Sequence, residues 1–121
     1  SIAQITAEAL TLAQKIGLDL NTFKEVNAGT TANNGQFHIN FLSKVLKNDI
    51  EPGFTIDLAH KDMGLAIETA NSFRVGLPVG SSVQAVYGQA RSGKFAKKDF
   101  SALLDYACEL AEVDPPRIKK S

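Results

Sequence analysis

The sequence predicts an all-α protein, a compact bundle of about six helices. Apolar residues recur at spacings of three and four along most of the chain, which is the period of an amphipathic helix. No segment has the sustained apolar and polar alternation that predicts a strand. The chain has 121 residues, 44% of them apolar, so it is long enough for one domain with a single core.

The first two predicted helices are separated by Gly17. The first covers residues 2–16 and has the pattern of an amphipathic helix. The second is capped by Asp19 or Asn21 and ends near Gly29, because short polar side chains cap helix starts and glycine ends helices. The apolar stripe of the first helix consists of Ile2, Ile5, Ala9, Leu12 and Ile16, and the second helix carries Leu20, Phe23 and Val26.

A polar loop from Gly29 to Gly35 leads into the third predicted helix, whose apolar face begins at Phe37 and ends at Leu46. Several loop residues tolerate left-handed backbone conformations. Two interpretations stay open for the loop. Its backbone N–H groups bind an anion, or it is a flexible connection that borders a substrate pocket.

Three more helices follow a break at residues 48–53. The fourth runs from about Asp57 to Phe73, with an apolar stripe along it. The fifth starts at Pro78, which is favoured in a first helical turn, and the sixth is capped by Asp99 or Ser101. Residues 1–116 are expected to form the domain, and residues 117–121 a polar tail. The fourth stripe consists of Ile56, Ala59, Met63, Ala66, Ala70 and Phe73.

Composition excludes several classes of function. With 13 basic and 13 acidic residues the formal charge is zero, whereas a nucleic-acid surface requires a basic excess. No apolar run reaches the roughly 20 residues that cross a bilayer. Cys108, the lone cysteine, is expected to be a buried, inert thiol and fits a reducing cytoplasm. His38 and His60 have no second ligand at metal-binding spacing, so no metal site is predicted.

The segment from Gly88 to Lys94 has most of the spacing of a phosphate-binding loop. The next residue, Phe95, stands where the motif requires a hydroxyl for magnesium, and a helix precedes the segment where a strand is required. The segment is therefore interpreted as the end of a helix that stops at Gly93.

Lys61 is the candidate ligand-binding residue. It lies early in the fourth helix, and the aromatic residue Phe54 comes just before that helix. A cation at this place suits an anionic or polarised ligand. The alternative is a solvated lysine paired with Asp57 one turn earlier. Gly64, a costly residue inside a helix, favours close approach of a ligand or of another backbone.

Four ordered segments resemble the family of 3-hydroxyisobutyrate and 6-phosphogluconate dehydrogenases. They are Glu8–Leu18, Pro52–Asp62 with its Lys61-Asp62 pair, Leu77-Pro78, and Asp99–Leu103. Members of this family have a dinucleotide-binding domain followed by an all-helical C-terminal domain. The resemblance implies that this chain is the helical domain, because no Gly-x-Gly-x-x-Gly follows a predicted strand.

The resemblance also implies a role for particular residues. Lys61 and Phe54 match family positions that face the coenzyme, NAD or NADP. The family's catalytic lysine lies upstream of the segment that matches Glu8, so no catalytic residue is assigned. The implied partners are an N-terminal Rossmann domain and a short 3-hydroxy acid. A homodimer is expected as well, because a helical domain made to pack against a partner has apolar faces to cover, and symmetric pairing is the commonest solution. The loop at residues 33–36 departs from the serine- and glycine-rich family pattern, which leaves the substrate open.

A second function class stays open at this point. Without a complete catalytic constellation, the chain also fits a non-catalytic helical interaction module. Apolar surface on the helix from Ile2 to Ile16 would then serve a protein partner.

Overall fold

The computed structural model describes residues 1–118, and these form an all-α domain, as the sequence predicts. Within the described residues there is no strand, only an isolated bridge between Thr55 and Asp99. The α-helices are α1 (Ile2–Lys15), α2 (Leu20–Ala28), α3 (Ile56–Ser72), α4 (Pro78–Arg91) and α5 (Leu103–Leu110). The third predicted helix is instead a π-helix, η1 (Gln36–Phe41), and a 3-10 turn, η2 (Val45–Lys47), and a second 3-10 turn, η3 (Phe100–Ala102), precedes α5.

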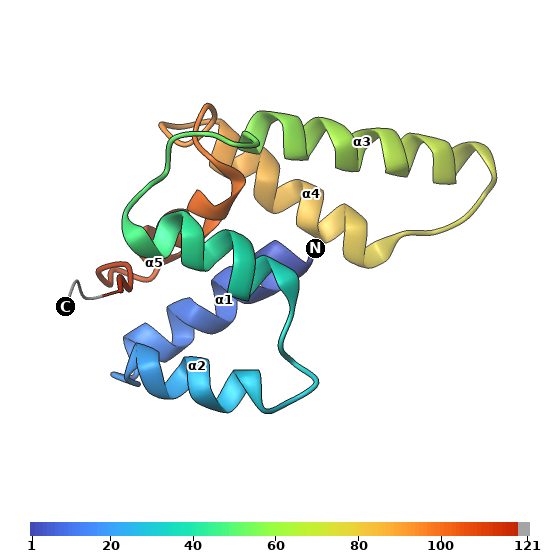
Figure 1. Ribbon diagram of the computed structural model, residues 1–121. Coiled ribbons are helices and arrows are strands. Elements are labelled where there is room, and N and C mark those ends of the chain that lie inside the picture. The colour runs from blue at the N-terminus through green and yellow to red at the C-terminus, as the bar shows by residue number, and fades with distance from the viewer. Residues whose placement is uncertain (119–121) are drawn as a thin grey trace.

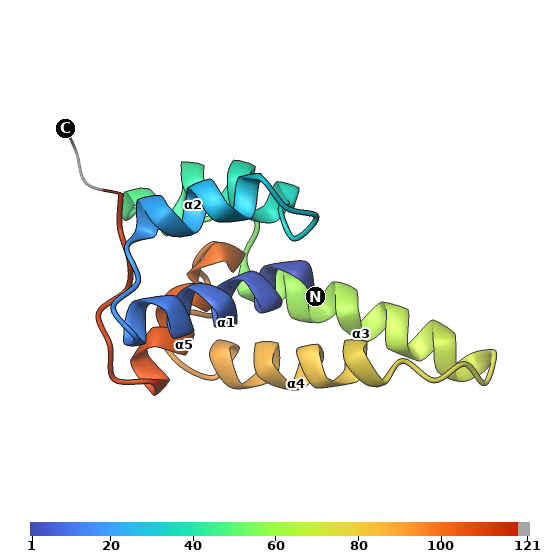
Figure 2. The same ribbon diagram turned by 90° about the horizontal axis from the view of Figure 1, so that it is seen from below.

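The domain consists of a body and a projecting hairpin. In the body α1 packs against α5 and η1, whereas α3 and α4 pack mainly against each other. Both views show the α3–α4 hairpin extending away from the body, with the described C-terminal end on the opposite side (Figures 1 and 2). The residues of the α3–α4 turn are therefore far from the core.

Short polar side chains cap α2, α3 and η3, and two of these caps, Asp19 and Asp99, are ones that the sequence predicts. Asp19 accepts a hydrogen bond from the backbone N–H of Thr22 at 3.0 Å and caps α2. Thr55 Oγ1 accepts from the N–H of Leu58 at 3.1 Å and caps α3. Asp99 caps η3 in the same way. Each cap satisfies an N–H that has no partner inside its helix.

The core lies between α1, η1, η2 and α5, and it extends to the body ends of α3 and α4. Its side chains are removed from water almost completely, which supplies the main driving force for folding. The largest fully buried side chains are Phe41, Leu10, Leu46, Ile56, Leu103, Leu104 and Val45.

The apolar stripe predicted for the first helix does not face the core. Its large members are exposed: Ile5 by 62%, Leu12 by 62% and Ile16 by 70%. The buried face of α1 instead carries alanines with Leu10, and small side chains let α5 and η1 lie close to the helix axis. Periodicity therefore predicts the helix correctly but assigns the wrong face to this core. The buried alanines are Ala3, Ala7 and Ala13.

The stripe predicted for the fourth helix is buried only near the body. Ile56 and Ala59 are in the core, but Phe73 at the far end of α3 is 76% exposed. Between them, Gly64 faces α4, and a Cβ added there would lie 3.0 Å from Gln84 Nε2. The glycine therefore leaves room for the Gln84 amide between the two helices of the hairpin.

The chain stays attached to the domain beyond the boundary expected at residue 116. The guanidinium of Arg117 donates two hydrogen bonds to Asp105, at 2.8 and 3.0 Å. The N–H of Ile118 donates to the carbonyl of Leu46 at 2.7 Å. Packing therefore continues to residue 118. The rest of the predicted tail, residues 119–121, lies outside the described residues.

Candidate functional site

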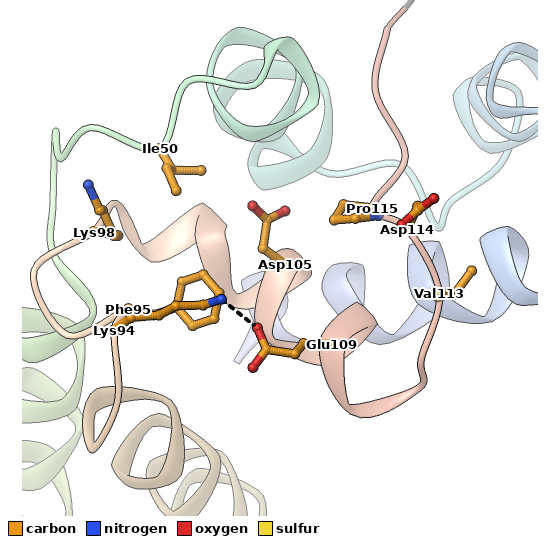
Figure 3. Close-up of a pocket in the computed structure, with 9 residues that line it drawn as sticks. All are labelled: Ile50, Lys94, Phe95, Lys98, Asp105, Glu109, Val113, Asp114 and Pro115. Carbon is orange, nitrogen blue, oxygen red and sulfur yellow. Dashed lines mark ion pairs between the residues drawn. The ribbon is translucent and has the colours of Figure 1, made fainter.

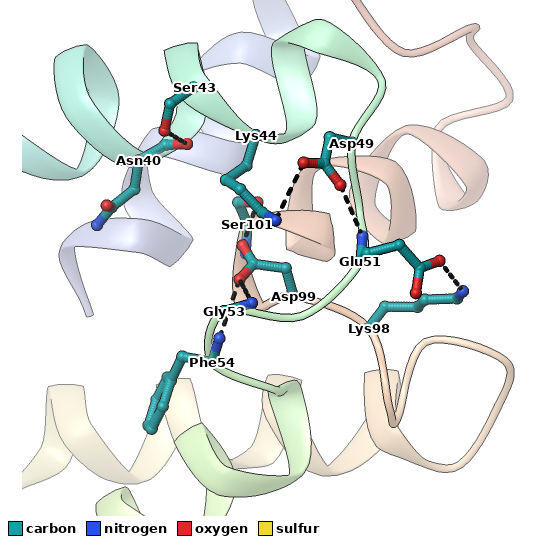
Figure 4. Close-up of polar contacts among 10 residues, drawn as sticks. All are labelled: Asn40, Ser43, Lys44, Asp49, Glu51, Gly53, Phe54, Lys98, Asp99 and Ser101. Carbon is teal, nitrogen blue, oxygen red and sulfur yellow. Dashed lines mark hydrogen bonds and ion pairs between the residues drawn. The ribbon is translucent and has the colours of Figure 1, made fainter.

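A buried carboxylate holds the segment that enters α3. Asp99 is only 3% exposed, and its Oδ1 accepts hydrogen bonds from the N–H groups of Gly53, at 3.0 Å, and Phe54, at 3.1 Å. Its Oδ2 accepts from the N–H of Ser101 at 3.1 Å and from the Ser101 hydroxyl at 2.5 Å (Figure 4). The backbone at Phe54 is thus held by Asp99, which lies just before η3 and α5.

Phe54 stands between two hollows of the surface. Its ring packs edge-on against Phe100, with the ring centroids 5.7 Å apart. One cavity, of about 440 Å³, is lined by Phe54 together with residues at the start of α1 and along α3, including Met63. The other, of about 350 Å³, is lined by Phe54, Asp99, Lys44 and neighbouring residues. Phe54 therefore contributes to the lining of both cavities.

Lys61 is exposed in the second turn of α3. Asp57, the expected ion-pair partner, accepts instead from Arg91 Nε at 2.7 Å and lies 3.3 Å from Lys97 Nζ. The Arg91 and Lys97 side chains lower the pKa of Asp57. Within residues 1–118 Lys61 has no ion pair or side-chain hydrogen bond, so it is solvated, as the alternative expects, but the expected pair with Asp57 is absent.

Two neighbours of Lys61, Gly64 and His60, face the other helix of the hairpin. Gly64 accommodates Gln84, as described above. The ring of His60 lies against Gly88 of α4, where an added Cβ would be 3.6 Å from His60 Nε2. These residues pack the hairpin, so the candidate site reduces to Lys61, on exposed surface, and Phe54, at a cavity wall.

The largest described cavity, of about 500 Å³, includes neither Lys61 nor Phe54. It lies between the start of α5, the segment after α4 and the C-terminal segment (Figure 3). Most of its charged side chains are engaged in ion pairs: Lys94 with Glu109 at 3.0 Å, Lys98 with Glu51 at 3.0 Å and Asp105 with Arg117 at 2.8 Å. These ion pairs leave few free charges for a ligand.

The other residues that could carry chemistry have contacts that hold the fold together. Cys108 is fully buried, its sulfur lies 3.5 Å from Thr11 Oγ1, and burial raises the pKa of its thiol, as expected for an inert cysteine. No group of three metal-ligating side chains occurs in residues 1–118. In the loop before η1, Asn34 Oδ1 accepts from the N–H of Phe37 at 2.9 Å, so the loop caps the following helix.

No helix among the described residues has the length and apolar character needed to cross a membrane.

Sequence reasoning identified Asp99 only as a helix cap. Its bonds to Gly53 and Phe54 join residues 45 or 46 positions apart, and no local pattern signals a contact at that separation. The only indication in the sequence is that Pro52-Gly53-Phe54 and Asp99–Leu103 belong to the same set of family-like segments.

Comparison with known proteins decides the family. A model described as the NAD-binding region of NADP-dependent 3-hydroxyisobutyrate dehydrogenase matches residues 1–107. The chain belongs to this family. It is an oxidoreductase family whose members use NAD or NADP, which favours the enzyme interpretation over an interaction module.

Similar proteins include 3-sulfolactaldehyde reductase of Escherichia coli, 40% identical over 101 residues that make up 84% of this chain. A probable 3-hydroxyisobutyrate dehydrogenase of Mycobacterium bovis is 33% identical over 81% of this chain. The solved structure of Mycobacterium tuberculosis 3-hydroxyisobutyrate dehydrogenase with L-serine has a TM-score of 0.77 and 32% identity, and the match covers 87% of this chain and 38% of that one. The chain spans about a third of the length of these relatives: 34% of the reductase and 35% of the M. bovis protein.

Proposed function

We propose that the chain is the helical C-terminal domain of an NAD(P)-dependent dehydrogenase that interconverts a short 3-hydroxy acid and its semialdehyde. The support is its family membership, its all-helical fold and the match to only a third of each relative. A nucleotide-binding Rossmann domain would precede Ser1 in the same polypeptide, and the enzyme would work in the cytoplasm.

The observation that carries the proposal is a free cation close in sequence to an aromatic cavity wall. Lys61 is exposed and unpaired within residues 1–118, and Phe54 lies at the base of the same helix, where it lines two cavities. These residues fit a dinucleotide, whose phosphates and polarised oxygens attract an ammonium group and whose rings pack on aromatic surface. The coenzyme, when bound, supplies the hydride chemistry.

The domain itself contributes binding and orientation. Lys61 would hold oxygen atoms of the coenzyme, and Phe54 would exclude water from its side of the site. No catalytic residue is assigned to this chain, because the family's lysine would lie upstream of Ser1.

The test is an assay of the longer protein that contains this sequence. We expect NAD- or NADP-dependent turnover with at least one short 3-hydroxy acid or semialdehyde, from a panel that includes 3-hydroxyisobutyrate and 3-sulfolactaldehyde. The 121-residue chain assayed alone should be silent, because it would lack the catalytic lysine. Turnover by the isolated chain, or a reading frame with an initiator methionine directly before Ser1, would contradict the proposal.

We also propose that the protein pairs with a second copy through the exposed face of α1. Ile5 and Leu12 are each 62% exposed, and Leu12 borders a groove of about 470 Å³ between α1, α4 and α5. Gln4 also lines this groove, and its buried Oε1 has no hydrogen-bond partner within residues 1–118. A symmetric dimer covers one such face with another.

Sedimentation measures this assembly. The longer protein should be a dimer, and Ile5→Asp combined with Leu12→Asp should give a folded monomer, since both side chains are exposed in the domain. Val26→Asp on α2, where Val26 is 63% exposed, is the matched control and should stay dimeric. A monomeric wild type, or a dimer that survives the double substitution, would contradict pairing through α1.

A further inference from the structure

The polar contacts around Asp99 do more than start a helix. Four donors converge on this carboxylate: the N–H groups of Gly53, Phe54 and Ser101, and the Ser101 hydroxyl. An ionised carboxylate has about four lone-pair positions and donates nothing, so it satisfies this set completely. No other single side chain of similar size offers four acceptor positions.

The same carboxylate lies where two distant segments run antiparallel. The N–H of Phe100 donates to the carbonyl of Phe54 at 2.7 Å, and the N–H of Asp99 to that of Ile50 at 2.9 Å. The N–H of Ile56 donates to the carbonyl of Lys98 at 3.0 Å. Asp99 therefore sits at the middle of a short junction between two antiparallel segments, which fixes residues 50–56 against residues 98–100.

The junction determines where Phe54 and α3 lie. Phe54 has both its N–H and its carbonyl bound there, and its ring packs on Phe100 next to Asp99. The first turn of α3 is bound through Ile56, and Lys61 follows one turn later on the same rigid helix. A change at the junction moves the aromatic wall and the cation together.

We infer that Asp99 is a positioning residue for the coenzyme site: it touches no coenzyme, but it holds Phe54 and the start of α3 where they meet the coenzyme. The inference rests on the proposed function, because it gives Asp99 a role at that same site. Its alternative is a purely structural carboxylate, whose loss would lower stability and leave coenzyme binding unchanged.

The experiment compares Asp99→Ala with Asp99→Asn in the longer protein. Alanine removes the acceptor for Gly53 and Phe54, and we expect the coenzyme Kd to rise about tenfold, which corresponds to about 1.4 kcal/mol of binding free energy. Asparagine can keep an oxygen toward Gly53 and Phe54 while its amide N–H donates to the Ser101 hydroxyl, but the backbone N–H of Ser101 then has no acceptor. It should therefore restore part of the affinity that alanine loses.

Asp105→Ala is the matched control. Asp105 lies in α5, and its loss removes the ion pair with Arg117 Nη2 without touching the junction. It should lower the melting temperature and leave the coenzyme Kd within about twofold, as expected for loss of a contact outside the site. Equal effects of Asp99→Ala and Asp105→Ala on Kd would overturn the positioning role.

Hydrogen exchange of residues 51–56 gives a readout independent of activity. The Gly53 and Phe54 amides should exchange faster in Asp99→Ala than in Asp105→Ala or the wild type. Unchanged exchange would overturn the anchoring itself. If Asp99→Ala does not fold, Asp99→Ser takes its place with the same expected order. A wild type that binds no coenzyme would instead refute the proposed function, while exchange would still decide whether Asp99 anchors the segment.

Discussion

Replacing Lys61 with alanine in the longer protein is expected to weaken coenzyme binding about 10- to 100-fold, which corresponds to losing one hydrogen bond to a charged group, about 1.5–3 kcal/mol. The free energy of unfolding should change by less than about 0.5 kcal/mol, as for an ordinary surface position. The reason is that Lys61 has no ion pair or side-chain hydrogen bond within residues 1–118 and is exposed to solvent.

The matched control is Lys47→Ala. Lys47 is an exposed lysine at the end of η2 with no ion pair within residues 1–118, so its removal changes the net charge equally. Titration of both variants with NAD and with NADP separates a specific contact from a general charge effect. Lys61→Arg should retain part of the affinity, because it keeps the charge. If Lys61→Ala binds and turns over like Lys47→Ala, Lys61 has no place in the site.

The absence of an ion pair between Lys61 and Asp57 could not be predicted from the sequence. Asp57 and Lys61 have the acid-before-base spacing that favours an ion pair within a helix. Arg91 ends α4 and Lys97 lies in the turns that follow it, more than 30 residues after Asp57 in the sequence, and both pair with its carboxylate. Local spacing gives the set of possible partners, and tertiary contacts decide among them.

Helix existence and helix starts depend on local physics, so the sequence predicts them well. Asp19, Thr55 and Asp99 each bind an N–H within three residues, and such caps are visible in the chain itself. Which face of a helix is buried depends on the elements that pack against it. In α1 the large apolar residues point to solvent because α5 and η1 lie on the alanine face, which periodicity alone does not indicate.

The second large effect concerns stability. Phe41→Ala should lower the free energy of unfolding of the 121-residue chain by about 3–5 kcal/mol, the usual cost of emptying a buried phenylalanine site. Phe41 in η1 is completely buried and is the largest fully buried side chain. A loss of this size is a large part of the total stability of an ordinary domain, about 5–15 kcal/mol.

Phe73→Ala is the control with the same chemistry. Both phenylalanines lie on apolar stripes predicted from the sequence, but Phe73 is 76% exposed at the end of the hairpin, so its loss should cost less than about 0.5 kcal/mol. Urea unfolding of the two variants measures the difference, with an unchanged slope as the check that the same surface is exposed. A loss at Phe73 as large as that at Phe41 would mean that the hairpin tip is buried in an assembly. In that case the exposed apolar surface of α3 and α4 would belong to an interface, and pairing through α1 alone would not account for it.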